Sequence, residues 1–238
     1  MKQITNFFAV ILFVTIAILV AGCGKEEKES EYINYKPEDK ANYNTDDWVD
    51  LGLPSGLLWA TRNVGASSPE DYGDFFAWGE TTSKSIYGWS TYQYSSDYNK
   101  LTKYCTNSEH GYNGFIDNLT TLTYDDDAAT AHYGGRTPTK SEWVELLNNT
   151  TSQWTSINGL NGRIFIGSNG KTLFLPAAGY RSYYETIGVG DCGFYWSSSL
   201  DDGYLSYAGG LYFSLEGVIY GSGERCDGST VRAVMDVQ

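Results

Sequence analysis

Positive charge is scarce in this chain of 238 residues. It has 16 lysines and arginines against 29 aspartates and glutamates, which gives a formal net charge of −13 at pH 7. The basic residues are spread along the chain and form no cluster. Because an acidic surface repels a phosphate backbone, nucleic acid is excluded as an expected partner.

Histidine and cysteine are also sparse, and this limits the chemistry that the chain can support. The two histidines, His110 and His132, and the four cysteines show no C-x-x-C or H-x-x-x-H spacing, so we expect no metal site and no cofactor. Neither histidine lies beside a nucleophile elbow of the kind a Ser-His-Asp arrangement needs. A pair of carboxylates of the glycosidase type stays open, because separation in space does not follow from sequence.

Only one long apolar run is present, at the N-terminus. Residues 4–20 are almost wholly apolar, follow Lys2, and lead into Ala21-Gly22-Cys23. The run is shorter than the roughly 20 residues of a spanning helix and ends at a charged segment, which favours a cleaved signal over a membrane span. The ending resembles the lipobox of bacterial lipoproteins, in which the cysteine, here Cys23, becomes a lipidated N-terminus that anchors the chain to a membrane.

The predicted organisation follows from this ending. Residues 1–22 are a lipoprotein signal peptide, residues 23–45 are an acidic and polar linker, and residues 46–238 are long enough for one domain. Residues 24–27, Gly-Lys-Glu-Glu, resemble the export signal of Bacteroidota surface lipoproteins. We therefore expect a protein anchored in the outer membrane and facing outward, with a periplasm-facing location as the alternative.

Three further cysteines would then lie in an oxidising compartment, which permits one disulfide. Cys192 and Cys226 flank one glycine-rich stretch, whereas Cys105 lies in a separate segment. The sequence therefore predicts a disulfide between Cys192 and Cys226 and leaves Cys105 as a free thiol.

Patterns along 46–238 predict short strands and two helices. Two apolar runs around Pro-Ser-Gly predict a hairpin over 48–61, and Asn169-Gly170 between apolar runs predicts a second one. Residues 68–71 are typical of a short helix start and 75–78 of a buried strand, while 81–119 is expected to be a loop-dominated insertion packed by its aromatic residues. Asp125-Asp126-Asp127 predicts a capped short helix, and Thr139 with Glu142 forms a capping box before a second helix. The fold class expected is α+β with an antiparallel sheet.

Six ordered strings resemble the Fibrobacter succinogenes major paralogous domain, which is common in Bacteroidota lipoproteins. They are VDLGLPSGLLWAT (49–61), PEDYGDFFAWGE (69–80), GRTPT (135–139), LPAAGYR (175–181), YWSSS (195–199) and STVRAV (229–234). The resemblance implies a C-type lectin-like fold of the branch shared with formylglycine-generating enzymes. It implies that 48–51 pairs with 231–234, and that ligands bind loops within residues 161–227.

The same resemblance raises two activities that the residues do not favour. Formylglycine chemistry requires two closely spaced redox cysteines, and Cys226 has only Cys192 near it in sequence. Calcium-dependent sugar binding uses Glu-Pro-Asn or Gln-Pro-Asp and Trp-Asn-Asp strings, but Ser197 follows Trp196 here. We expect the acidic run 125–127 to cap a helix rather than bind a cation, because consecutive helix-start residues point in different directions. No catalytic residue is predicted.

Tyrosine is abundant toward the C-terminus, interleaved with serine, glycine and aspartate. The tyrosines concerned are Tyr180, Tyr183, Tyr184, Tyr195, Tyr204, Tyr207, Tyr212 and Tyr220. Binding loops use this mixture because tyrosine offers a large amphipathic contact at low entropic cost. Tyr195 and Tyr212 are expected in the core. The predicted ligand-binding residues, expected to be exposed, are Asp201, Asp202, Tyr204, Ser206, Tyr207 and Tyr220.

These observations predict a cell-surface lipoprotein that binds glycan or protein ligands without catalysis. The resemblance adds an alternative, the target of a diversity-generating retroelement whose variable stretch would be residues 195–234. A nearby reverse-transcriptase gene with a near-copy of that coding repeat would support it. A formylglycine-type oxidase or another envelope enzyme, and a purely structural envelope component, stay open.

Overall fold

The computed structural model describes residues 47–237, so the predicted signal peptide, Cys23 and nearly all of the linker lie outside the described residues. Among the described residues, no helix is both long and apolar enough to cross a membrane. The strands are β1 (Trp48–Asp50), β2 (Leu58–Ala60), β3 (Thr151–Ile157), β4 (Leu160–Ile166), β5 (Thr172–Pro176), β6 (Tyr180–Ser182), β7 (Glu185–Ile187), β8 (Cys192–Leu200), β9 (Tyr207–Ser214), β10 (Val218–Glu224) and β11 (Val234–Met235). The α-helices are α1 (Ala128–His132) and α2 (Lys140–Asn149), and the short 3-10 turns are η3 (Trp89–Thr91), η4 (Tyr112–Gly114) and η5 (Tyr124–Asp126).

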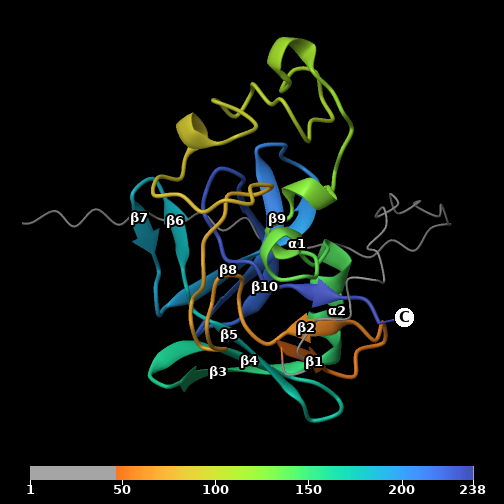
Figure 1. The fold of residues 1–238 in the computed structure, drawn as a ribbon, viewed down its shortest axis with the longest axis vertical. Helices are drawn as coiled ribbons and strands as arrows, with labels where there is room; N and C mark the ends of the chain where they lie inside the picture. The colour runs from red at the N-terminus through yellow and green to blue at the C-terminus, as the bar shows by residue number, and fades with distance from the viewer. Residues whose placement is uncertain (1–46, 238) are drawn as a thin grey trace, which may run out of the picture. The chain divides into compact units, whose positions relative to one another are not determined.

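The strands form small antiparallel sheets, and together with the two helices they confirm the α+β class (Figure 1). Three sheets have three strands each, in the orders β1-β2-β11, β3-β4-β5 and β10-β9-β8, and β6 with β7 makes a fourth. Every one of these pairings between adjacent strands is antiparallel.

Both predicted hairpins form. Trp48 pairs with Ala60 across β1 and β2, and the turn between β4 and β5 has Gly170 at φ 78°, a conformation that glycine adopts without steric cost. One expected pairing is wrong, because the last strand lies beside β2 rather than beside β1. Val234 of β11 pairs with Trp59, so β2 is the central strand of that sheet.

The helix starts follow the side-chain caps seen in the sequence. Asp127 accepts a hydrogen bond from the Ala129 amide at the start of α1. At α2, Thr139 accepts from the Glu142 amide and Glu142 accepts from the Thr139 amide, which completes the capping box. Residues 68–71 form a turn and no helix, because Gly73 at φ 71° leaves the helical region before a full turn can follow. The strand expected at 75–78 is reduced to one bridge, from Phe76 to Ser229.

Two aromatic cores lie on the two faces of β8. Successive strand residues point to opposite faces, so Phe194 and Trp196 contribute to one core and Tyr195 to the other. The first core also contains Trp78 and residues of the insertion, and the second contains Trp143 from α2. The sheet β8–β10 is therefore the central layer on which helix and insertion pack.

The insertion is loop-dominated and packed by its aromatic residues, as predicted. Tyr87, Tyr92, Tyr94 and Tyr104 are all buried in the first core. In Figure 1 the segment runs from yellow to green at the top of the view, with η3 and η4 as its short turns. Because aromatic contacts hold it, a segment with almost no regular structure still has a defined position against the sheet.

Candidate functional site

A pocket with a volume of about 560 Å³ lies between the insertion and the loop that joins β8 to β9. One wall consists of residues 199–206, together with Lys140 at the start of α2. The other wall, called the insertion wall below, consists of Thr106, Asn107 and His110 of the insertion and of Thr120 and Thr121, which directly follow it. Its lining is mostly hydroxyl, amide and charged side chains, which makes it a polar site of a size typical for small ligands.

Four of the six predicted ligand-binding residues line this pocket: Asp201, Asp202, Tyr204 and Ser206. Tyr204 is 70% exposed, and Asp202 is also exposed. Asp201 and Ser206 are only partly exposed, because they also form the turn that shapes the loop. The prediction of exposure therefore holds fully for two of these four residues.

Hydrogen bonds within the loop 201–207 hold its shape. Asp201 Oδ1 accepts from the amides of Gly203 and Tyr204, each at 2.8 Å. The Tyr207 amide donates to the Tyr204 carbonyl at 2.9 Å, and the Asp201 amide donates to the Tyr207 carbonyl at 3.2 Å. A loop closed in this way loses little conformational freedom on binding, which favours affinity.

The insertion wall is attached to β8 through its backbone. The Leu200 amide donates to Thr120 and the Leu122 amide donates to Ser198, both at 2.8 Å. The His110 carbonyl accepts from the Leu101 amide at 2.8 Å, while the buried His110 Nδ1 atom has no hydrogen-bond partner within 47–237. No local sequence pattern marks the insertion residues as site residues, because they reach the pocket only through this long-range pairing.

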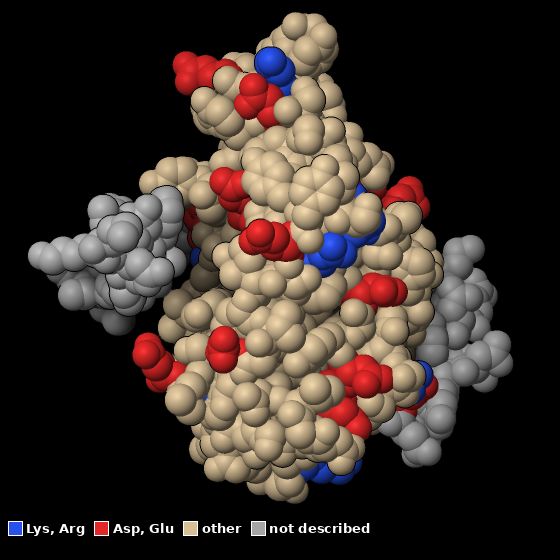
Figure 2. All heavy atoms as spheres, turned by 90° about the vertical axis from the view of Figure 1, so that its left-hand side faces the viewer, with Lys and Arg blue, Asp and Glu red and all other residues tan. Residues whose placement is uncertain are grey.

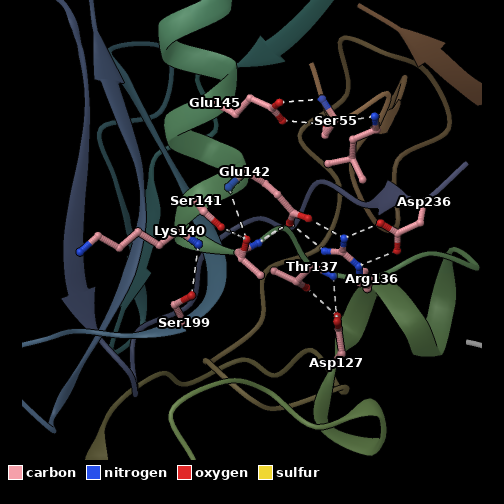
Figure 3. Close-up of polar contacts among 12 residues, drawn as sticks. Ser55, Asp127, Arg136, Thr137, Lys140, Ser141, Glu142, Glu145, Ser199 and Asp236 are labelled. Atoms are coloured by element: carbon pink, nitrogen blue, oxygen red, sulfur yellow. Dashed lines mark hydrogen bonds and ion pairs between the residues drawn. The ribbon is translucent and has the colours of Figure 1, made fainter. Parts of the chain in front are cut away.

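Lys140 supplies the positive charge of the pocket. Sequence reasoning did not identify it as a site residue, because its position predicts only that it begins a helix. Its ammonium group pairs with the Asp202 carboxylate and lies 5.8 Å from the centre of the Tyr220 ring. In Figure 3 the Lys140 side chain points away from the capping box, while its backbone amide donates to Ser199. Both side chains of the pair are well exposed, so the pair contributes little to stability and its groups stay accessible to a ligand.

The other two predicted residues, Tyr207 and Tyr220, lie outside the pocket lining. The centre of the Tyr207 ring is 6.0 Å from that of the Tyr204 ring, and the two rings are tilted relative to each other. Tyr220 is partly buried and forms a 2.9 Å hydrogen bond with Ser197, and burial raises the pKa of its phenol to about 12. The expectation that both are exposed is wrong, because strands β9 and β10 turn their rings toward neighbouring side chains.

The remaining tyrosines divide between the core and a second surface. Tyr195 is fully buried, as predicted, but Tyr212 is 36% exposed, so its expected core position is wrong. Tyr183 and Tyr184 form the turn between β6 and β7 and are 63% and 73% exposed. On the face drawn in Figure 2, charged side chains form small scattered groups with wide uncharged areas between them.

The predicted disulfide is absent from the described residues. Cys105, Cys192 and Cys226 are all free and buried. Cys192 packs beside Gly188, whereas the Cys226 thiol donates to Glu224 at 3.6 Å. Flanking the same glycine-rich stretch does not bring two side chains together, because the strands between them set the positions of both.

One group of potential metal ligands occurs among residues 47–237. The ligand atoms of Glu224, Cys226 and Asp227 lie within 4.8 Å of one another. Burial, together with Asp227 and Glu224, raises the pKa of the Cys226 thiol, so the thiolate that would bind a metal or attack a substrate is disfavoured. The acidic run 125–127 does not belong to this group. Asp125 is part of η5, and Asp126 accepts hydrogen bonds from Tyr94 and Thr123.

Asp227 makes the stability of the protein depend on pH. Burial, with a smaller contribution from Glu224, raises the pKa of this carboxyl to about 6, against an ordinary value near 4. As pH rises from about 4 to 6, the unfolded chain releases this proton first, so the group lowers the free energy of unfolding over that window. Asp227→Asn removes this effect. The difference in free energy of unfolding between variant and wild type should therefore shift in favour of the variant from pH 4 to pH 7. Equal differences at both pH values, measured by urea denaturation, would contradict the assignment.

Charged residues around the start of α2 perform structural roles (Figure 3). Arg136 bridges the carboxylates of Glu142 and Asp236, which ties the helix start to the segment after β11. Burial disfavours the charge of Arg136, but these two carboxylates outweigh it and raise the pKa of the guanidinium. Asp127, which caps α1, also accepts from the Thr137 amide at 2.7 Å.

Comparisons of this chain with models of protein families, with curated proteins and with solved structures find no match. The class that the structure itself defines is a mixed α+β protein with short antiparallel strands and a polar pocket between its insertion and its central sheet.

Proposed function

We propose that this chain is a lipoprotein of the bacterial outer membrane whose domain, residues 46–238, binds glycan or protein ligands on the cell surface without catalysis. The observation that carries the binding role is the polar pocket beside the loop 201–206. Four residues chosen from composition alone line it, and the loop is held rigid by its own hydrogen bonds. A preformed pocket of about 560 Å³ falls within the size range of small-ligand binding sites.

The proposed cellular location rests on the sequence alone. An apolar run that ends in Ala21-Gly22-Cys23 supports lipidation of Cys23, and Gly-Lys-Glu-Glu after it supports export to the outer face. Acyl chains on one cysteine would hold the protein at a membrane, at about 0.8 kcal/mol for each buried methylene group.

The C-type lectin-like fold and membership in the Fibrobacter succinogenes major paralogous domain family are part of this proposal. The six motif strings support both. The sheet β1-β2-β11 differs in one respect from what the resemblance implies, because β2 lies between the first and last strands of the domain. The enzyme alternative has less support, because the Cys226 thiol has a raised pKa and Cys192 is not paired with it.

Intact cells that display the full chain provide the test. They should retain labelled oligosaccharides or proteins, and cells carrying Tyr204→Ala should lose that retention while the chain stays at the surface. Cys23→Ser should release both chain and ligand from the cells. Tyr184→Ala, which removes an equally exposed tyrosine from β6–β7, is the matched control and should change nothing. Retention that survives Tyr204→Ala would contradict the proposed site, and a wild-type chain that added protease cannot reach would contradict the surface location.

A further inference from the structure

The insertion wall of the pocket presents uncharged groups that donate and accept hydrogen bonds. Thr106, Thr120 and Thr121 offer hydroxyls, and Asn107 offers an amide. His110 adds a buried Nδ1 atom that has no partner within the described residues. An unpaired buried polar atom is destabilising, so a ligand hydroxyl that reaches Nδ1 through a turn of the His110 ring would relieve that cost on binding.

The charges of the opposite wall favour a neutral ligand. Asp201 and Asp202 face one cation, Lys140, and the Lys140 ammonium already pairs with Asp202. The remaining negative charge disfavours carboxylate, sulfate or phosphate groups in the pocket. Carboxylate oxygens accept strong hydrogen bonds from hydroxyl donors, and the ammonium donates to hydroxyl oxygens. A ligand rich in hydroxyl groups can use both without bringing a charge of its own.

The volume of the pocket and the exposure of Tyr204 also favour a small ligand rich in hydroxyl groups. A cavity of about 560 Å³ falls in the range of small-ligand sites, whereas a specific protein partner would cover roughly 800 Å² of surface. Tyr204 stands at the rim with 70% of its surface exposed, so a flat aromatic face is available to stack against the apolar face of a sugar ring.

We propose that this pocket binds the terminal sugars of a neutral oligosaccharide, held between Tyr204 on one wall and His110 with Thr121 on the other. The proposal rests on the proposed binding function and assigns its ligand class. It also assigns half of the site to the insertion wall. That wall lies outside residues 161–227, where the resemblance implies that ligands bind.

A glycan array of neutral, uronic-acid-containing and sulfated oligosaccharides, probed with the detergent-solubilised full chain, tests the ligand class. Binding should be confined to neutral oligosaccharides. Tyr204→Ala and His110→Phe should each weaken the best hit at least tenfold, which corresponds to about 1.4 kcal/mol. Thr121→Val, which replaces only a hydroxyl by a methyl group, should weaken it severalfold without affecting the fold. Tyr184→Ala should bind as the wild type does, and unchanged thermal melting would show that each variant is folded.

The outcomes separate the two proposals. Loss of binding in Tyr204→Ala with full binding in both His110→Phe and Thr121→Val would overturn the role of the insertion and leave the binding function standing. Preference for acidic oligosaccharides, or binding of a protein with no oligosaccharide bound, would overturn the ligand class alone. Neutral binding that Tyr204→Ala does not weaken would overturn the site. A wild-type chain that binds neither class of ligand would overturn both proposals.

Discussion

Replacing Arg225 by methionine should destabilise the protein by about 4 kcal/mol, since three carbonyl oxygens would lose their donor in or near the core. Arg225 is fully buried, and its guanidinium donates to the carbonyls of Tyr104, Leu205 and Lys103 at 2.9–3.0 Å. It also lies 5.2 Å from the centre of the Trp78 ring, a favourable position for a cation. One side chain thus links the insertion to the loop beside the pocket.

Urea denaturation with fluorescence detection measures the effect. Arg225→Lys keeps the charge but one ammonium group does not reach all three carbonyls, so its loss should be intermediate. Arg62→Met is the matched control: Arg62 is 35% exposed in its ion pair with Asp47, and its removal should cost less than about 1 kcal/mol. If Arg225→Met and Arg62→Met had similar midpoints, Arg225 would not connect the insertion to the sheet.

Replacing Trp143 by alanine should cost about 3–5 kcal/mol, the range for a large aromatic side chain removed from a packed core. Trp143 is fully buried at the first turn of α2, with its ring centre 4.7 Å from that of Trp59. Its Nε1–H donates to the Trp196 carbonyl at 3.2 Å, so the alanine variant leaves both a cavity and an unpaired carbonyl. The helix would lose its main contact with the central sheet.

Two further variants divide this effect into its parts. Trp143→Phe keeps most of the apolar contact and removes the hydrogen bond, so we expect roughly a third to a half of the loss. Trp154→Ala, at a partly buried position on β3, should cost less because the site is already open to solvent. Thermal and urea denaturation should rank the variants in that order, and a larger loss in Trp154→Ala would show that α2 is not the main support of the sheet.

Local features were predictable because the interacting groups are neighbours in sequence. Thr139 and Glu142 are three residues apart, so their capping box follows from spacing alone. Asn169-Gly170 predicts its turn because glycine accepts the positive φ that the turn requires. The loop 201–206 was predictable as a binding segment from its composition, although exposure was overestimated for Asp201 and Ser206.

Long-range features were not predictable, since nothing local specifies which strand lies beside which. The position of β11 next to β2, the separate environments of Cys192 and Cys226, and the burial of Arg225 all depend on topology. Arginine is mostly exposed in proteins, and only carbonyls brought together from distant segments make its burial here favourable. His110 enters the site for the same reason, through the pairing of residues 120–122 with β8.

By itself, the sequence determined the acidic character, the helix caps, the hairpin turns and the segment that carries most of the predicted site. Tertiary structure decided that this segment faces the insertion across a pocket, that Lys140 and His110 complete the lining, and that the cysteines stay apart. The physical reason is the separation in sequence between the groups that interact. Caps and turns are held by hydrogen bonds between near neighbours, whereas a pocket exists only once distant segments have packed their aromatic residues around one sheet.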